Sequence, residues 1–405
     1  MRPGPLALVS VLSAVIGAAI VIGVGSAFDW VGTSRTETIV AAPPLIASEQ
    51  ESPLPRPTAG PLPGDGFDAA RIYEARADGV VTILAFFGET ATGDGGQGSG
   101  FVVSDEGHIL TSSHVITNVG AGSSLAQARA ADTVYVEFRD GDRVPAEVVG
   151  WDVFDDVALL KVDPDAHELQ PIPLGDSSEV VVGQPVAAIG SPFGNENSLG
   201  VGVVSATGRA IEALTSRYHL VDAIQIDAPL NRGNSGGPLL DARGNAIGIN
   251  AQIRSDSGLA EGVGFAVPIN AAKRSLEELL EDGEVSYAYV GVLTDELWPA
   301  LARHLKLGVT RGALIAEVVD DGPAARAGLR GGSRTVVFQG QEVTVGGDIV
   351  LAVDGHPIER GDDLVRIVTN ILRPGERSVF TVFRNGRRLN LSVTLAERPA
   401  DPGLG

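Results

Sequence analysis

The sequence predicts a mainly β protein in which two small β-barrels precede an α+β domain, with an apolar helix near the start of the chain. Two sets of about six short β-branched runs, both rich in glycine and bounded by turn residues, predict the barrels. A helical pattern closes the second set, and strands then alternate with helices. With 405 residues, the chain is long enough for several domains with cores of their own.

The apolar segment at residues 5–28 carries no charge and exceeds the roughly 20 residues that span a bilayer as a helix. Residues 1–28 are therefore predicted to form a membrane anchor. A cleaved secretory signal is the alternative, because "GSA" near the end of the segment suits a cleavage site. A buried soluble helix is disfavoured, because the segment is apolar on all sides. Arg2 precedes the segment and Asp29 follows it, so the positive-inside rule places the rest of the chain outside the cytoplasm.

Residues 29–67 are rich in Pro, Ala, Ser and Thr, as in "AAPPLIASEQESPLPRPTAGPLPGDG". They hold too few large apolar side chains to form a core, so they predict a disordered, extended linker. A short helix, "FDAARIYEARADG", leads from the linker into the first β-run.

The first barrel is predicted between residues 80 and 162, in the runs "VVTILAFF", "GSGFVVS", "HILTSSHVI", "TVYVEF", "RVPAEVVGW" and "VALLKV". The second is predicted between residues 184 and 268, in "QPVAAIGSP", "GVGVVSATGRA", "AIQIDAP", "GPLLD", "NAIGINAQI" and "GVGFAVP". The helix "INAAKRSLEELLEDG" follows, with Asn270 as its expected N-cap and Gly283 at its end. These elements make one domain at residues 68–283.

The third unit, at residues 286–398, mixes the strands "YVGVLT", "GALIAEVV", "DIVLAVDG", "RSVFTVFRNG" and "RLNLSVTLA" with the helices "PAARAGL" and "DDLVRIVTNIL". Its length suits a small α+β domain. Residues 399–405 are expected to be a loose tail.

Composition excludes several functions. The 30 Lys and Arg stand against 51 Asp and Glu, and a formal net charge of -21 repels a phosphate backbone, so no nucleic-acid partner is expected. The absence of cysteine removes disulfides, thiolate nucleophiles and cysteine-based zinc sites. No two histidines have the helical spacing of a zinc site, so neither a metal nor another cofactor is expected.

The glycine-rich stretch "NRGNSGGPLL" around Ser235 matches two kinds of hydrolase. Its G-x-S-x-G pattern occurs in α/β-hydrolases, but that fold needs a helix after the serine and a catalytic histidine further along the chain. A proline and a β-hairpin follow Ser235 instead, and the later histidines, His304 and His356, belong to another predicted domain. The order His, Asp, Ser of double-barrel serine proteases remains.

His114 is the predicted general base, because it ends a strand of the first barrel and a suitable carboxylate follows. Asp156 directly precedes the strand "VALLKV", where it can accept the Nδ1 proton of His114. Its neighbours Asp152 and Asp155 are expected to be solvated. The remaining histidines are interpreted as surface or structural residues: His108, His167, His219, His304 and His356.

Each of these residue types is required by the chemistry. A serine hydroxyl is a weak nucleophile near neutral pH unless an imidazole takes its proton. The aspartate holds the imidazole in the correct tautomer, and fixed donors must meet the oxyanion that forms. Glycines around Ser235 allow the amides of Gly233 and Ser235 to converge on that oxyanion. Activity is expected to fall below about pH 6.5 if the pKa of His114 has its ordinary value.

Several motifs in order resemble the HtrA/Deg family of trypsin-fold serine proteases. They are "SGFVVSDEGHILTSSHVI", "DDVALLKV", "GSPFGNENSLGVGVVSATGR", "IQIDAPLNRGNSGGPLLDARGNAIGIN" and "GVGFAVP". The resemblance covers residues 68–283 and implies a triad of His114, Asp156 and Ser235 in a double β-barrel. Arg232 departs from the family, which commonly has proline there.

The resemblance also locates the primary substrate pocket, at Leu230 and at Ile249, Asn250 and Ala251 of "GINAQI". No acidic residue occupies these positions, so the pocket is predicted to accept Val, Ala, Leu or Ile rather than Lys or Arg.

The third unit resembles a PDZ domain, and "GPAARAGLRGG" and "GGDIVLAVDG" add to the match. The resemblance makes Tyr289, Val290, Gly291 and Val292 the loop that binds a peptide carboxylate, beside a groove lined by "DDLVRIVTNIL". The segment "SRTVVFQGQEVTV" is longer than in a minimal PDZ domain and predicts a hairpin. A simple spacer is the alternative interpretation.

The resemblance as a whole implies a membrane-anchored endopeptidase that degrades or processes misfolded or regulatory proteins outside the cytoplasm, and it implies a homotrimer. The expected partners are unfolded protein substrates, C-terminal peptides at the PDZ domain, and the membrane. The alternative is a chaperone or a PDZ-dependent sensor in which proteolysis is secondary; the intact triad argues against it.

Overall fold

The computed structural model describes residues 66–88, 95–119, 125–191, 197–213, 215–216, 218–231, 233–253 and 263–400. The predicted apolar helix at 5–28 and almost all of the linker lie outside these ranges. Within them, no helix has the length and apolarity needed to cross a membrane.

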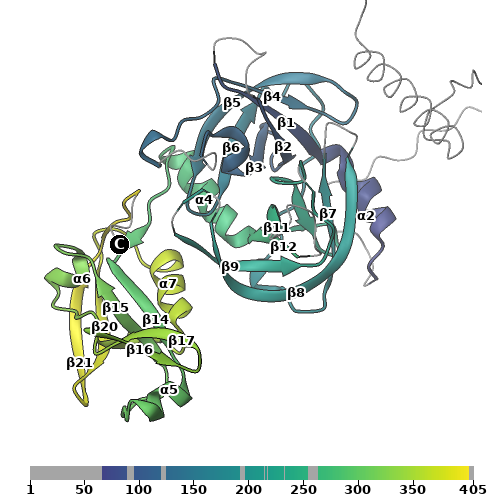
Figure 1. Cartoon of the computed structure of the whole chain (residues 1–405). Coiled ribbons are helices and arrows are strands. Elements are labelled where there is room, and N and C mark those ends of the chain that lie inside the picture. The colour runs from purple at the N-terminus through teal and green to yellow at the C-terminus, as the bar shows by residue number, and fades with distance from the viewer. Residues whose placement is uncertain are drawn as a thin grey trace, which may run out of the picture. The chain divides into compact units, whose positions relative to one another are not determined.

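The first β-barrel is closed and has the strand order β1-β2-β3-β6-β5-β4 (Figure 1). Its strands are β1 (Val80–Phe86), β2 (Gly95–Val102), β3 (His108–Thr111), β4 (Thr133–Glu137), β5 (Arg143–Asp152) and β6 (Val157–Val162). The alternating burial of β4 shows one face turned to the barrel interior. The predicted run at 108–116 is divided, because the strand ends at Thr111 and a single helical turn, α3 (Ser113–Ile116), follows.

The second barrel is also closed, with the strand order β10-β11-β12-β9-β8-β7 (Figure 1). Its strands are β7 (Pro185–Gly190), β8 (Ser198–Glu212), β9 (His219–Ile226), β10 (Pro238–Leu240), β11 (Ala246–Ile253) and β12 (Gly264–Pro268). The prediction of two all-β halves is therefore confirmed. Closure pairs every strand edge, which protects both barrels from edge-to-edge association.

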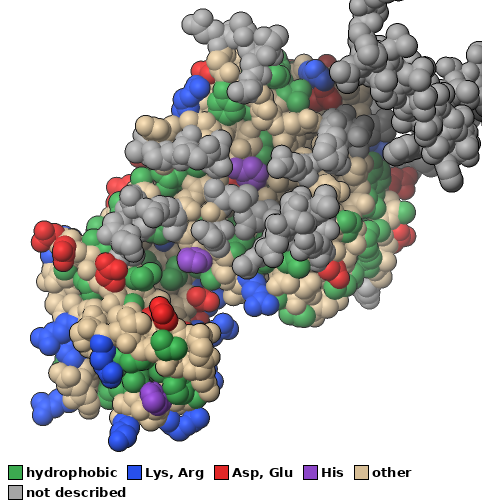
Figure 2. All heavy atoms as spheres, viewed as in Figure 1, with side chains coloured by type: hydrophobic (Ala, Val, Ile, Leu, Met, Phe, Trp, Pro, Cys, Tyr) green, Lys and Arg blue, Asp and Glu red, His purple; other side chains and the backbone are tan. Residues whose placement is uncertain are grey.

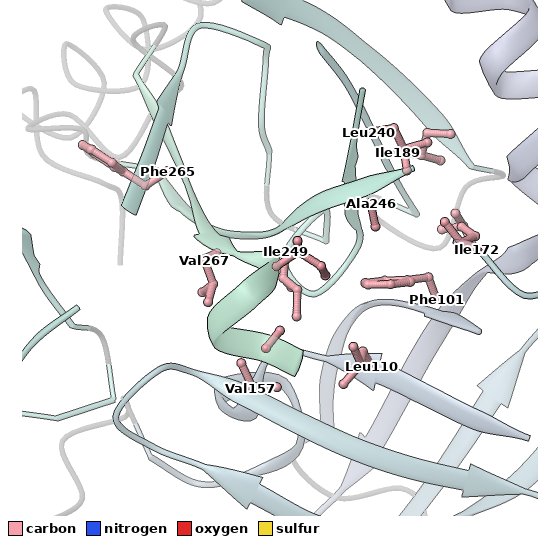
Figure 3. Close-up of a cluster of buried hydrophobic side chains, with 14 of the residues drawn as sticks. Phe101, Leu110, Val157, Ile172, Ile189, Leu240, Ala246, Ile249, Phe265 and Val267 are labelled. Atoms are coloured by element: carbon pink, nitrogen blue, oxygen red, sulfur yellow. The ribbon is translucent and has the colours of Figure 1, made fainter. Parts of the chain in front are cut away.

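A buried hydrophobic cluster joins the two barrels (Figure 3). Phe101 and Leu110 from the first barrel and Ile189 and Ile249 from the second are no more than 1% exposed, and Ile172 of the connecting segment lies beside Phe101. Since burying one such side chain contributes roughly 1.5–3 kcal/mol, this shared core fixes the barrels against each other.

Two helices lie against the barrels, α2 (Ala69–Arg76) and α4 (Ile269–Glu281). Helix α4 packs on β5 and β6 of the first barrel and on β11 and β12 of the second. The prediction that Asn270 caps this helix is wrong: Pro268 is the N-cap, and the side-chain Nδ2 of Asn270 donates to Asp176 instead. Three 3₁₀ turns complete this part: η1 (Ala77–Gly79), η2 (Leu125–Gln127) and η3 (Ser177–Glu179).

The C-terminal unit contains a sheet of order β14-β15-β18-β20-β21, with β19 paired to β18. The strands are β13 (Ala288–Tyr289), β14 (Val292–Leu297), β15 (Gly312–Val318), β16 (Arg334–Phe338), β17 (Gln341–Val345), β18 (Ile349–Val353), β19 (His356–Pro357), β20 (Arg377–Arg384), β21 (Arg387–Thr394) and β22 (Ala396–Glu397). The helices are α5 (Pro299–His304), α6 (Pro323–Arg326) and α7 (Gly361–Asn370).

Two features of this unit bear on its sequence prediction. The segment "SRTVVFQGQEVTV" forms the hairpin β16-β17, as predicted. Helix α5 was not predicted; it begins with Pro299 at its first turn and contributes Leu301 and Ala302 to a second small core with Val343 and Val345 of the hairpin.

The C-terminal unit differs from the rest of the chain in charge. Residues 286–398 hold nearly equal numbers of basic and acidic side chains, so the net negative charge of the chain is carried entirely by the other residues. On the face shown in Figure 2, Lys and Arg side chains are numerous around this unit. A carboxylate-bearing peptide would therefore meet little net repulsion there.

Candidate active site

His114 and Asp156 meet on two neighbouring strands of the first barrel. His114 lies on α3, directly after β3, and Asp156 directly precedes β6, which pairs with β3 through Thr111 and Ala158. The Nδ1 atom of His114 lies 2.7 Å from Oδ2 of Asp156. The other carboxylate oxygen of Asp156 accepts hydrogen bonds from the His114 amide and the Ser113 hydroxyl, both at 2.9 Å. Both oxygens of the Asp156 carboxylate are thus engaged, and the imidazole is held through Nδ1.

The pKa of His114 is raised above its ordinary value of 6.5. Burial alone lowers this pKa, but the charge of Asp156 and its hydrogen bond to the ring together outweigh burial. The expectation of a transition at the ordinary pKa is therefore corrected upward: an imidazole beside this carboxylate becomes protonated at a higher pH.

Asp152 and Asp155 are buried, not solvated as the sequence suggested; they are 2% and 3% exposed. Asp155 forms an ion pair with Arg274 of α4, and Asp152 accepts the amides of Phe154 and Asp155, closing the turn before Asp156. Burial and the nearby charge of Asp152 raise the pKa of Asp155 to about 6. These contacts brace the turn from which Asp156 projects.

Ser235 lies in the turn between β9 and β10, which brings the second barrel to the first. Gly233 and Gly236 have φ values of 101° and 87°, a region that glycine adopts readily and other residues do not. The Ser235 hydroxyl donates to the carbonyl of Ala251 at 3.0 Å. Ala251 lies at a β-bulge between β11 and β12, which explains why its carbonyl is not used in the ladder.

In this arrangement, the Ser235 hydroxyl is hydrogen-bonded to Ala251 and not to His114. The structure thus brings His114 and Asp156 together as predicted, while the serine occupies a different hydrogen bond. The predicted proton transfer to His114 would require the hydroxyl to leave the Ala251 carbonyl.

The predicted oxyanion donors are unoccupied within the described part of the chain: the amides of Gly233 and Ser235 donate to none of its residues. The carbonyl of Asn234 accepts from the Gly237 amide at 3.1 Å. Because the carbonyl and the following N–H point in opposite directions across a trans peptide, this bond directs the Ser235 amide the other way. The Ser235 amide therefore remains available to a ligand.

The four residues predicted for the substrate pocket have different surroundings in the structure. Leu230 is nearly buried and lies against Gly264, where an added Cβ would meet its Cδ1 atom at 2.8 Å. Ile249 is part of the core between the barrels (Figure 3). Asn250 is fully buried, and its side-chain Nδ2 donates to the Pro238 carbonyl at 3.2 Å. Leu230 and Ala251 are buried as well, at 4% exposure each. They are the more useful pocket positions because Ala251 contacts the Ser235 hydroxyl and Leu230 lies against Gly264 of β12.

In the C-terminal unit, the predicted carboxylate loop is a tight turn between β13 and β14. Gly291 has a φ of 78°, and its carbonyl accepts from the Val319 amide at 3.0 Å. The Val290 carbonyl accepts from Ala324 at 2.9 Å. Strand β14 is at the edge of its sheet and packs against α7. An edge strand beside a helix is the geometry to which an extended peptide can add.

The other histidines are placed in ordinary structural surroundings. His108 shares a hydrogen bond with Ser104 at 2.8 Å. His167 stacks on Phe138, and His304 on Phe338, while His219 and His356 are exposed. Arg232, the departure noted in the sequence, lies outside the described residues.

Sequence reasoning missed Ser99, which touches the nucleophile turn from the first barrel: its amide donates to the Ser235 carbonyl at 2.8 Å. The available signal was its position in "GSGF", because glycines on either side of a buried polar residue indicate close backbone approach.

Two family models match the double barrel and the C-terminal unit. Residues 98–249 match the family model described as a trypsin-like peptidase domain, and residues 289–395 match a PDZ domain. A probable periplasmic serine endoprotease, DegP-like, from Pseudomonas putida is 39% identical over 311 residues, which are 76% of this chain and 58% of the relative. A protein of the same description from Halomonas elongata is 39% identical over 302 residues, 75% of this chain and 56% of that relative. The chain thus spans less than two thirds of these relatives.

Among solved structures, the HtrA-type protease AlgW with a tripeptide has a TM-score of 0.67 and 35% sequence identity, covering 82% of this chain and 98% of that one. The serine endoprotease from Yersinia pestis has a TM-score of 0.58 and 28% identity, covering 83% of this chain and all of that one (100%).

Proposed function

Since this chain belongs to the HtrA-type serine proteases, with a trypsin-like peptidase domain and a PDZ domain, we propose that it is an endopeptidase that cleaves unfolded or regulatory proteins through a Ser235 acyl-enzyme. The observation that carries the proposal is the 2.7 Å contact between His114 and Asp156, with the unoccupied amide of Ser235 in the facing turn.

The reaction follows from these positions. Once Ser235 has left the Ala251 carbonyl, its oxygen attacks the substrate carbonyl while His114 takes its proton, and Asp156 stabilises the imidazolium. The negative oxygen that forms accepts from the amides of Gly233 and Ser235; each such donor is worth about 3 kcal/mol. The imidazolium then gives its proton to the leaving amine, and a water molecule, activated by the same imidazole, hydrolyses the ester.

Hydrolysis of unfolded casein by the full-length chain and by Ser235→Ala tests the activity. The wild type should release peptides. The variant should keep only the small residual rate that substrate binding and the oxyanion donors provide without a nucleophile. Equal rates in the two proteins would reject the enzyme and would leave the chaperone or sensor function. Aggregation assays with the variant then measure any holding activity separately.

A bound peptide would add as a strand to β14, with its C-terminal carboxylate at Tyr289, Val290, Gly291 and Val292. The support is the edge position of β14 and the packing of α7 beside it. A fluorescent peptide with a free C-terminus should bind the full chain, and its amidated form should bind at least tenfold more weakly. Equal affinity for the two peptides would exclude this loop as the carboxylate site.

The location is proposed to be extracytoplasmic, with residues 5–28 as a single membrane anchor. The relatives from Pseudomonas putida and Halomonas elongata are described as periplasmic, and the uncharged length of 5–28 supports the anchor. Cells expressing the full chain should retain it in the membrane after alkaline carbonate washing. The mass of the extracted protein distinguishes an intact anchor from a cleaved signal.

A homotrimer is proposed from the family resemblance alone. Light scattering of the detergent-solubilised chain should give three times the monomer mass. A monomer at micromolar concentration would reject this assembly.

A further inference from the structure

Ser99 lies where β2 of the first barrel touches the nucleophile turn of the second. Its side chain is fully buried, and the contact around it is unusually close. A Cβ added to Gly236 would meet the Ser99 carbonyl at 2.1 Å, and one added to Gly190 would meet the Ser99 hydroxyl at 3.0 Å. The backbone of the turn therefore rests directly on Ser99, with no room for a larger neighbour.

Ser99 uses both its backbone amide and its hydroxyl to hold this turn. The amide donates to the Ser235 carbonyl at 2.8 Å. The hydroxyl donates to the Gly233 carbonyl at 2.5 Å and accepts from the Ser191 amide at 2.8 Å. The Ser191 bond orients the hydroxyl, because it occupies an acceptor site of the oxygen and leaves the proton for Gly233.

These bonds fix the two peptide units that flank the one carrying the Ser235 amide. The peptide after Gly233 is held at its carbonyl by Ser99 and at its N–H by the Asn231 carbonyl, at 3.0 Å. The peptide after Ser235 is held at its carbonyl by Ser99 and at its N–H by the Asn250 carbonyl, at 2.7 Å. The Ser235 amide lies between two planes that cannot rotate while these bonds persist.

The same residue is tied to the segment that carries the base. The Thr111 hydroxyl donates to the Ser99 carbonyl at 2.6 Å, and Thr111 is the last residue of β3, three positions before His114. Ser99 thus joins the turn of Ser235 to the strand that leads to His114, although the two belong to different barrels.

We propose that Ser99 is a positioning residue: its hydroxyl holds the peptide after Gly233 so that the amides of Gly233 and Ser235 point at the substrate oxygen. This inference rests on the proposed endopeptidase activity. Loss of the Ser99 hydroxyl should weaken stabilisation of the transition state and not binding of the substrate, because the oxyanion forms only in the transition state.

The test compares Ser99→Ala with Thr82→Val in the full-length chain. Thr82 is a matched control, because it is buried in the same barrel and its hydroxyl donates to the Ser191 hydroxyl at 2.7 Å, not to any of the described residues 233–235. We expect both variants to lower the melting temperature by similar amounts. Ser99→Ala should also lower kcat about 100-fold, with KM changed less than about threefold.

A peptide boronic acid with an aliphatic end residue provides a second readout. It forms a tetrahedral adduct with Ser235 that resembles the transition state, so Ser99→Ala should weaken its binding by about the same factor as it lowers kcat/KM. A competing peptide that forms no adduct should keep its affinity. If Ser99→Ala does not fold, Ser99→Cys keeps a buried side chain with a weak donor, and it should show the same pattern with a smaller loss of kcat.

The outcomes separate this inference from the proposed function. A wild-type chain that does not cleave peptides rejects the endopeptidase itself. A wild-type chain that cleaves, with Ser99→Ala or Ser99→Cys no slower than Thr82→Val after correction for folded protein, rejects the positioning role alone. A rise in KM without a fall in kcat also rejects it, because substrate binding would then be the property that Ser99 supports.

Discussion

Asp156 holds His114 from a backbone conformation that few residues adopt: its φ is 55°, and its carboxylate accepts from both the ring and the amide of His114. A left-handed residue costs about 1 kcal/mol or more. Here it turns the chain immediately before β6, so that one carboxylate reaches across to α3. The orientation of the His114 imidazole thus depends on Asp156, a residue in a strained backbone conformation.

The first prediction concerns pH. The general base must be neutral, and the pKa of His114 is raised above 6.5. Protonation therefore removes activity at a higher pH than for an ordinary histidine, and kcat/KM should decline as the pH falls through a midpoint above 6.5. Stopped assays between pH 5 and 9 measure the midpoint. The exposed His356 supplies the control, since His356→Gln should leave the curve unchanged; a midpoint at or below 6.5 in the wild type contradicts the prediction.

Asp156→Asn should lower kcat by about 10⁴-fold, because an amide no longer favours the reactive tautomer of His114 or stabilises its cation. Folding should survive, since an asparagine oxygen still accepts from the His114 amide and the Ser113 hydroxyl that Asp156 now binds. Asp140→Asn, at an exposed aspartate, is the control. Retention of more than about a tenth of the activity by Asp156→Asn would argue against its assigned role.

Gly236→Ala should abolish hydrolysis. The added Cβ would meet the Ser99 carbonyl at 2.1 Å at a residue whose φ is 87°, so the turn of Ser235 must move. Gly183 has a φ of 88° with nothing within 4 Å of the added Cβ, and Gly183→Ala should cost about 1 kcal/mol of unfolding free energy while leaving kcat/KM intact. Equal activities in the two variants would show that the close contact is dispensable.

Cleavage should occur after Val, Ala, Leu or Ile, because Leu230 and Ala251 are apolar and no acidic residue occupies positions 230 or 249–251. Sequencing the products of a peptide library measures the preference. Gly264→Ala should shift it toward Ala over Leu by about tenfold, since the new methyl group crowds Leu230. Products that end mainly in Lys or Arg would overturn the assignment of this pocket.

The ion pair between Asp155 and Arg274 should be important for stability. Arg274→Met leaves a buried carboxylate without its partner, which typically costs about 3–5 kcal/mol. The loss should be larger at pH 8 than at pH 5. The pKa of Asp155 is raised to about 6, so the folded protein favours the neutral acid and the penalty is relieved as the pH falls through that value. Urea unfolding at both pH values measures this; Arg129→Met, at an exposed pair, should leave the midpoint unchanged.

The strands could be predicted because they depend on local information, whereas the pairing of His114 with Asp156, which are 42 residues apart, was predicted from the chemistry that a serine nucleophile requires. Apolar runs between turn residues determine each strand, and β3 and β6 are neighbours in a barrel of this order. The incorrect predictions about the site concern contacts between residues that are far apart in the sequence. Asp155 was expected in solvent because its partner, Arg274, lies 119 residues away on a helix that no local pattern places against it.

The role of Ser99 depends on contacts at similar distance, since Gly233 lies 134 residues further along the chain. The hydrogen bond from Ser235 to Ala251 depends on a side-chain rotation and on a bulge in β11. Neither contact produces a periodic pattern in the sequence, so both could be identified only from the three-dimensional structure.

The division of the site between two barrels has a consequence for biosynthesis. A growing chain that has emerged only as far as Val162 can close the first barrel and pair His114 with Asp156, yet it has no nucleophile. Ser235 follows more than seventy residues later, and its turn is held both by bonds within the second barrel and by the Ser99 amide of β2. A chain that has emerged no further than the first barrel therefore lacks the nucleophile of the proposed endopeptidase.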